Sequence, residues 1–130
     1  KIIGYDTHGR TVDKAEQNIA NALFEDLIEV RHGDFFDTKK PENEYATHLV
    51  FNPPYGERLK VDTHSLYGLI GDTLKTHYQE SNAWMITSDL EALKNVGLRP
   101  SRKIKLYQGK LECRFVKYEM YQGSKKAKKQ

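Results

Sequence analysis

The residues Asn52-Pro53-Pro54-Tyr55 form the most distinctive polar motif in the sequence. They follow an apolar run, residues 48–51, and a strand formed by that run must end there because proline cannot donate to a sheet ladder. The prolines stiffen the backbone, so the Asn52 side chain and the Pro53 carbonyl are expected to face outward as two neighbouring acceptors. Two such acceptors match the two hydrogens of a planar NH2 group. The alternative is a rigid turn that follows a buried strand and does no chemistry.

An amine held by two acceptors can turn its lone pair toward an electrophile. The exocyclic nitrogen of a nucleobase is a poor nucleophile because its lone pair is delocalised into the ring. Holding it in line with a reactive carbon would therefore supply most of the catalysis. Tyr55 would stack on the base that bears the amine, a contact worth about 1–3 kcal/mol. No strong base is needed, since the nitrogen's proton becomes acidic once the nitrogen is alkylated.

Two carboxylates occupy similar places earlier in the chain. Asp6 and Asp34 each come just after a short apolar run, and ligands of open α/β sheets bind outside the carboxyl ends of the strands. Asp6 could accept both hydroxyls of a ribose, and Asp34 could accept from an exocyclic adenine amine, with Phe35 packing on the purine. Asp is also a common turn and cap residue, which is the alternative for each acid alone. Together with Asn52, they predict one ligand-binding rim for an adenosine-shaped molecule.

The elements that must position these residues alternate along the chain. Apolar spacings of three and four predict helices over residues 12–23 and 65–78. Short apolar runs predict strands at residues 2–6, 27–30, 48–51 and 83–87. Strands separated by helices predict a parallel, doubly wound α/β sheet.

The last third of the chain has a different pattern. Ser88 and Glu91 are spaced as in a capping box, which predicts a short helix that buries Leu90 and ends at Gly97. Two alternating segments on either side of Gln108-Gly109 predict a terminal antiparallel β-hairpin. Cys113 lies in the second of them and is expected to be a small buried hydrophobic residue.

Composition narrows the class of protein. The 130 residues suit one domain, and 38% hydrophobic content excludes a disordered or collagen-like chain. A single cysteine excludes an internal disulfide, and the five histidines lack metal-ligand spacing, so we assign no metal. No apolar run approaches a membrane span, and we expect a cytoplasmic protein. Residues 99–130 hold 11 Lys or Arg against 2 Asp or Glu. Such a basic end could attract the phosphates of a nucleic acid, and the alternative for its last residues is a solvated, frayed tail.

With these residues identified, the sequence resembles class I S-adenosylmethionine-dependent methyltransferases that modify exocyclic amines. The strings NPPYGERL, TSDLE and KLYQGKLECRF make it similar to the catalytic domain of bacterial THUMP-containing guanine-N2 methyltransferases of large-subunit ribosomal RNA, the UPF0020 type. The likeness covers about residues 1–121. It implies a Rossmann-like methyltransferase sheet with the terminal antiparallel hairpin, S-adenosyl-L-methionine as cofactor, and ribosomal RNA as partner.

The resemblance also assigns roles to individual residues. Asp6 would hold the cofactor ribose, and Asp34 with Phe35 the adenine. Asn52, Pro53, Pro54 and Tyr55 would form the catalytic motif. Arg58 continues the family string and is expected to contact RNA. Apart from the resemblance, Arg99, Arg102 and Lys103 are placed near the predicted hairpin to line a path for RNA, and the alternative is that they are ordinary solvated charges on an edge hairpin.

One feature of the family is missing from the sequence. The glycine-rich loop that follows the family's first strand has no counterpart, since no G-x-G occurs, and Gly68 and Gly71 lie inside a predicted helix. We therefore expect residues 1–122 to be the C-terminal part of such a domain and residues 123–130 a disordered basic tail. The first-strand segment and the RNA-binding THUMP module are then expected to be further parts of the same polypeptide that act together with these residues. Without that strand, the sheet is expected to have exposed edges, and the fragment to bind cofactor poorly and show little activity.

Two other functions fit the same residues. An adenine-N6 methyltransferase acting on DNA or RNA uses the same Asn-Pro-Pro-Tyr chemistry. A non-catalytic RNA-binding or assembly fragment could retain the motif without ever binding cofactor.

Overall fold

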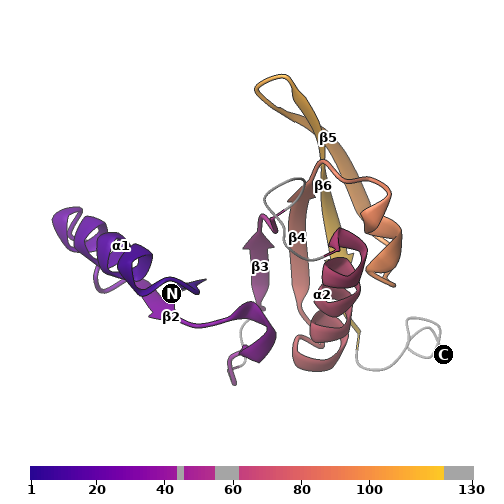
Figure 1. Ribbon diagram of the computed structural model, residues 1–130. Coiled ribbons are helices and arrows are strands. Elements are labelled where there is room, and N and C mark those ends of the chain that lie inside the picture. Colours follow the sequence, from indigo (N-terminus) through magenta and orange to yellow (C-terminus); the bar gives the residue numbers. More distant parts are fainter. Residues whose placement is uncertain (44–45, 55–61, 122–130) are drawn as a thin grey trace. The chain divides into compact units, whose positions relative to one another are not determined.

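The computed structural model of the chain describes residues 1–43, 46–54 and 62–121 (Figure 1). The chain divides into two units, residues 1–38 and residues 39–130. Each unit has a sheet of its own. None of the helices in the described part of the chain is long and apolar enough to cross a membrane.

The first unit is a β-α-β unit. Strand β1 (Ile2–Asp6) leads into helix α1 (Gly9–Asn21), and strand β2 (Ile28–His32) then pairs with β1 in parallel. A short 3-10 turn, η1 (Phe35–Asp37), follows β2. Val12 on α1 is the buried apolar side chain of this unit. The register pairs Asp6 with His32, so the two strands end together and the residues after them share one rim.

The second unit is a four-stranded mixed sheet. It contains β3 (His48–Phe51), α2 (Thr63–His77), β4 (Asn82–Thr87), the 3-10 turn η3 (Ala92–Asn95), β5 (Arg102–Gln108) and β6 (Leu111–Glu119). The strand order is β3-β4-β6-β5, parallel between β3 and β4 and antiparallel elsewhere. The hairpin predicted from sequence thus places its second strand inside the sheet and its first strand at the edge.

Helix α2 covers one face of this sheet. The core between them is formed by side chains that are almost wholly buried: Tyr67, Leu74, Met85, Val116 and Tyr118. Gly71 of α2 is also buried, and a Cβ atom there would meet the backbone of Val96. The two glycines noted in the sequence therefore lie in a helix, as predicted, and Gly71 allows close packing against the segment that follows η3.

The predicted third helix is wrong in its form. Residues 92–95 make only a 3-10 turn, and the Ser88–Glu91 capping box does not form. The carboxylate of Asp89 accepts from the Ala92 amide at 3.0 Å instead, and Leu90, expected to be buried, is 40% exposed. Gly97 does adopt a left-handed conformation, with φ of 76°. Asp89, one residue after Ser88, therefore supplies the cap that the sequence pattern assigned to the serine.

The predicted open sheet is present as two separate sheets. Among the described residues, β1 pairs with β2 alone and β3 pairs with β4 alone. One edge each of β1, β2 and β3 therefore has no strand partner in the part of the chain that the structure describes.

Candidate functional site

Asp6 lies at the carboxyl end of β1 and is half-buried. Its Oδ1 accepts a hydrogen bond from the His8 amide at 2.8 Å, so the carboxylate orders the turn that leads into α1. The His8 ring lies 3.5 Å from the same oxygen and is largely exposed. The turn role given as the alternative for Asp6 is therefore present, although its side chain does not cap α1. Because this contact involves only one of the two carboxylate oxygens, it is compatible with binding a ribose hydroxyl.

Asp34 follows β2 on the same rim. Its Oδ1 accepts from the Phe36 amide at 3.0 Å and begins η1. The Phe35 ring is half-buried and meets Phe36 edge to face, with centroids 5.5 Å apart. The first unit thus brings together the two acids and the aromatic ring that the sequence assigned to an adenosine. These two carboxylates fit the nucleoside end of such a ligand, since carboxylates accept from hydroxyl and amine hydrogens.

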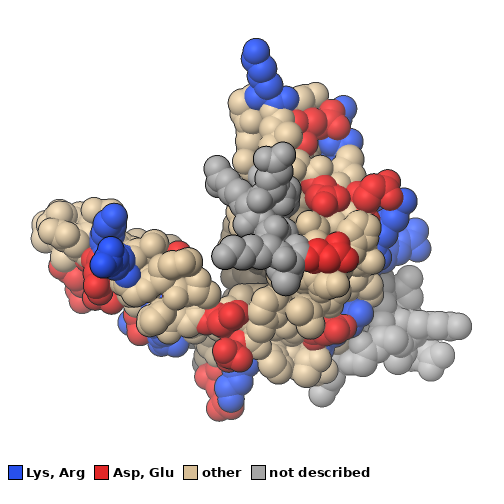
Figure 2. All heavy atoms as spheres, in the orientation of Figure 1, with Lys and Arg blue, Asp and Glu red and all other residues tan. Residues whose placement is uncertain are grey.

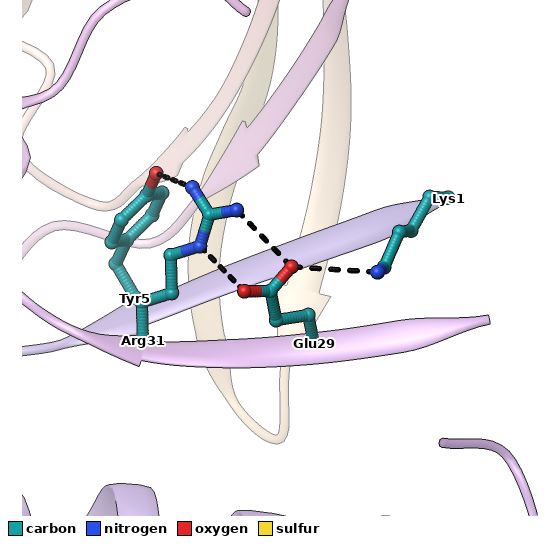
Figure 3. Close-up of polar contacts among 4 residues, drawn as sticks. All are labelled: Lys1, Tyr5, Glu29 and Arg31. Carbon is teal, nitrogen blue, oxygen red and sulfur yellow. Dashed lines mark hydrogen bonds and ion pairs between the residues drawn. The ribbon is translucent and has the colours of Figure 1, made fainter. Parts of the chain in front are cut away.

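A cluster of polar residues lies on one face of this small sheet (Figure 3). Glu29 binds Arg31 through both carboxylate oxygens, at 2.8 and 3.1 Å, and Lys1 lies 3.5 Å from Glu29. Arg31 also donates to the Tyr5 hydroxyl at 3.3 Å. The hydrogen bond from Arg31 lowers the pKa of Glu29 below its ordinary value. The cluster links β1 to β2 and remains exposed. Its acid, Glu29, lies on the face of the strands and is separate from Asp6 and Asp34 at the rim.

Asn52 lies at the carboxyl end of β3 in the second unit. Its side chain is exposed, Pro53 is buried and Pro54 is exposed. The buried proline anchors the motif at the strand end, and the carboxamide lies outside the core. Tyr55 and Arg58, expected to stack on the base and to contact RNA, lie outside the described residues.

A buried network lies on the strand next to this motif, and the sequence analysis missed it. Phe51 pairs with Met85, so the end of β4 at Thr87 lies beside the Asn52-Pro53 step. The Thr87 hydroxyl is hydrogen-bonded to the hydroxyl of Tyr67 on α2 and accepts from the Asp89 amide at 3.0 Å. Both side chains are wholly buried. The string TSD directly after a strand was the available signal, but it was interpreted as a helix start.

The same core raises the pKa of Tyr118 to about 12. Burial on β6 is the main cause, and the nearby Tyr67 adds to it. The neutral form is favoured because a phenolate in this core would lose its hydration. The Tyr118 hydroxyl therefore stays protonated well above neutral pH.

The cations assigned to RNA lie on or just before the hairpin. Arg99, Arg102 and Lys103 are exposed, and strand alternation places Arg102 and Lys103 on opposite faces of β5. Cys113 on β6 is fully buried, as predicted. Within the described part of the chain, no group of three or more His, Cys, Asp or Glu residues is placed to hold a metal ion.

The strand order and the helices that connect the parallel strands are those of a mixed α/β fold, and the solved structures that it resembles are Rossmann-like methyltransferases. The candidate methyltransferase SMU.472, crystallised with SAH, has the same fold, with a TM-score of 0.81 and 28% identity over 95% of this chain and 33% of that one. A protein from Listeria monocytogenes described as an N6-adenine-specific DNA methylase has a TM-score of 0.73 and 31% identity over 92% of this chain and 30% of that one.

Residues 1–117 match the family model described as UPF0020, RMKL-like, methyltransferase domain, and the chain belongs to this family. The ribosomal RNA large subunit methyltransferase K/L of Shewanella loihica is 34% identical over 126 residues. That match covers 95% of this chain and 17% of the relative. The family resemblance is thereby confirmed, and so is S-adenosylmethionine as the family's cofactor, because SAH is its demethylated product.

Proposed function

We propose that this chain is the catalytic part of an S-adenosylmethionine-dependent methyltransferase that modifies the N2 amine of a guanine in large-subunit ribosomal RNA. The observation that carries the proposal is the exposed Asn52 carboxamide at the end of β3, held there by the buried Pro53. The name of the Shewanella loihica relative, a ribosomal RNA large subunit methyltransferase, supports ribosomal RNA as the substrate. An enzyme acting on ribosomal RNA would work in the cytoplasm.

The two units have different roles in the proposed reaction. Asp6 and Asp34 would hold the ribose and adenine of the cofactor, and Phe35 would pack on the adenine. The cofactor supplies an electrophilic methyl group, which the amine nitrogen accepts while the sulfur leaves as a neutral thioether. The Asn52 carboxamide oxygen and the Pro53 carbonyl would accept the two amine hydrogens and aim the lone pair. The proton lost from the alkylated nitrogen passes to water.

The target base also has to reach Asn52 and be held there by residues of the chain. A guanine must leave its stack to reach Asn52, at a cost of a few kcal/mol that a loop or bulge lowers. Tyr55 would stack on the extruded base. Arg58, Arg99 and the cations of the hairpin would contact the RNA around it, and the first-strand segment and a THUMP module would complete the enzyme.

One observation favours a second candidate. The Listeria monocytogenes protein of the same fold is described as an N6-adenine-specific DNA methylase. Asn-Pro-Pro-Tyr would hold an adenine amine by the same two acceptors, so the alternative is adenine-N6 methylation of DNA or RNA.

The modified nucleoside distinguishes the two. Ribosomal RNA from a strain lacking the gene should lose one N2-methylguanosine by mass spectrometry, and restoring the gene should restore it. A lost N6-methyladenosine would indicate the second candidate. No change in any nucleoside would support the non-catalytic RNA-binding or assembly fragment.

A further inference from the structure

The β5–β6 hairpin projects beyond the rim that carries Asn52. Strand β4 ends at Thr87, which pairs with Arg114, so residues 111–113 of β6 and their partners on β5 extend past the end of β4. Figure 1 shows the hairpin continuing beyond the arrowheads of β3 and β4. A nucleic acid that presents a base at this rim would therefore run past the hairpin.

The two faces of the projecting hairpin differ in chemistry. Paired residues on neighbouring antiparallel strands share a face. One face carries the apolar side chains Ile104, Leu106, Cys113 and Phe115. The other face, which we call the basic face, consists of Lys103, Lys105, Tyr107, Glu112 and Arg114. Thr87, which contacts α2, pairs with Arg114, so the basic face is the one on the side of α2.

Tyr107 is the most exposed aromatic side chain described in this unit, at 61%. Its hydroxyl donates to Glu112 at 3.3 Å, which holds the ring over the strand pair. Lys105 and Arg114 also contact Glu112, at 3.5 and 3.2 Å. One carboxylate thus orients the exposed ring and two cations.

Charge on the hairpin exceeds what Glu112 can neutralise. Residues 102–117 contain six Lys or Arg and one Asp or Glu. Within the described part of the chain, Lys103 has no ion-pair partner. Figure 2 shows basic side chains at the projecting end of the hairpin. Exposed cations around an exposed aromatic ring are the combination with which proteins bind single-stranded nucleic acids.

We propose that the basic face binds unpaired RNA next to the target nucleotide, with Tyr107 stacking on a base and Lys103, Lys105 and Arg114 contacting phosphates. This rests on the proposed function, because extruding a target base requires flanking nucleotides that are unpaired or easily unpaired. The single-stranded form is favoured over a duplex because stacking on Tyr107 needs a free base. Arg102, on the apolar face, is not part of this surface.

The test measures binding of the 130-residue chain to a short fluorescein-labelled oligouridylate by anisotropy. Uracil has no exocyclic amine, so binding is measured apart from methylation. Tyr107→Ala should weaken binding by about 5- to 150-fold, the range set by loss of one stacked base. Tyr107→Phe keeps the ring and should bind within about twofold of the unchanged chain.

Lys103→Gln and Lys14→Gln form the matched pair, since each removes one positive charge from an exposed side chain and Lys14 lies on α1, outside the hairpin. Lys103→Gln should reduce the magnitude of the slope of log affinity against log salt by about 0.7, and Lys14→Gln should leave that slope unchanged. Equal slopes for the two variants would overturn the proposal.

Three other results would also overturn it. They are wild-type affinity in Tyr107→Ala, no binding by the unchanged chain, and equally strong binding of labelled polyglutamate, which would indicate an acidic protein partner. If Tyr107→Ala binds normally while the gene deletion removes N2-methylguanosine, the basic face fails and the proposed function stands. If Tyr107→Ala weakens binding while the gene deletion leaves N2-methylguanosine unchanged, the proposed function fails and RNA binding by the basic face stands.

Discussion

Replacing Gly71 by alanine tests the close packing of α2 against the segment after η3. A Cβ atom at Gly71 would lie 2.7 Å from the carbonyl carbon of Val96 and nearer still to its oxygen. These are backbone atoms, so no side-chain rotation can relieve the overlap. Gly68, one turn earlier on the same helix, is the matched control, because its Cβ would find ordinary contact at 3.7 Å from the Asn95 oxygen.

The two substitutions gain the same helix propensity and differ only in packing. Alanine is favoured over glycine inside a helix by about 1 kcal/mol, so Gly68→Ala should stabilise the chain by up to that amount. Overpacking costs about 1–3 kcal/mol, and overlap with backbone atoms belongs at the upper end of that range. After the gain in helix propensity is subtracted, Gly71→Ala should lower the free energy of unfolding of the chain by about 2 kcal/mol.

Thermal unfolding followed by circular dichroism measures the difference. At about 4–8 °C per kcal/mol for a unit of this size, the two melting temperatures should differ by roughly 10 °C or more, with Gly71→Ala lower. Equal or higher stability in Gly71→Ala would refute the contact between α2 and Val96. It would also remove the support this packing gives to the segment that follows Thr87.

Three further predictions concern the core and the cofactor. Tyr67→Phe removes one hydrogen bond of the network and should lower the free energy of unfolding by about 1 kcal/mol. Thr87→Val removes the hydroxyl that bonds Tyr67 and accepts from the Asp89 amide, two hydrogen bonds, and should lower it by about 2–3 kcal/mol; urea unfolding that ranks the two variants the other way would contradict the network. Because the pKa of Tyr118 is raised to about 12 in the folded chain, stability should be complete below pH 10 and fall as pH rises from 10 toward 12. Tyr118→Phe should flatten that loss, and an unchanged loss in a pH series of melts would exclude Tyr118 as its cause. Titration calorimetry of the 130-residue chain should show S-adenosylmethionine binding weaker than micromolar, because no G-x-G loop is present in its sequence; micromolar affinity would show that the described acids suffice.

The parts of the fold that follow from local sequence were predicted well. Strand β3 occupies the four residues expected because Pro53 and Pro54 end it, and Gly109, with φ of 63°, closes the hairpin. Alternation also predicted the burial of Cys113. These features depend on backbone restrictions and on a period of two, which single residues reveal directly.

Features that depend on tertiary contacts were missed. The spacing of Ser88 and Glu91 matches a capping box, but Thr87 binds Tyr67 and the Asp89 amide, which turns the chain before a helix can begin. The close approach at Gly71 likewise depends on Val96, 25 residues later in the sequence. For the candidate site, the sequence placed Asp6 and Asp34 at neighbouring strand ends. The division of the chain into two units leaves Asn52 on a rim of its own sheet.

The central claim is that the Asn52 carboxamide and the Pro53 carbonyl hold the amine that is methylated. The most direct measurement compares Asn52→Ala with the unchanged protein in the full gene product that contains this chain, following methyl transfer from labelled S-adenosylmethionine to ribosomal RNA and RNA affinity in parallel. We predict that methyl transfer falls by about 10²–10³-fold, the loss typical of removing one oriented hydrogen-bonding group, while RNA affinity is unchanged. An unchanged rate of methyl transfer in Asn52→Ala would contradict the account.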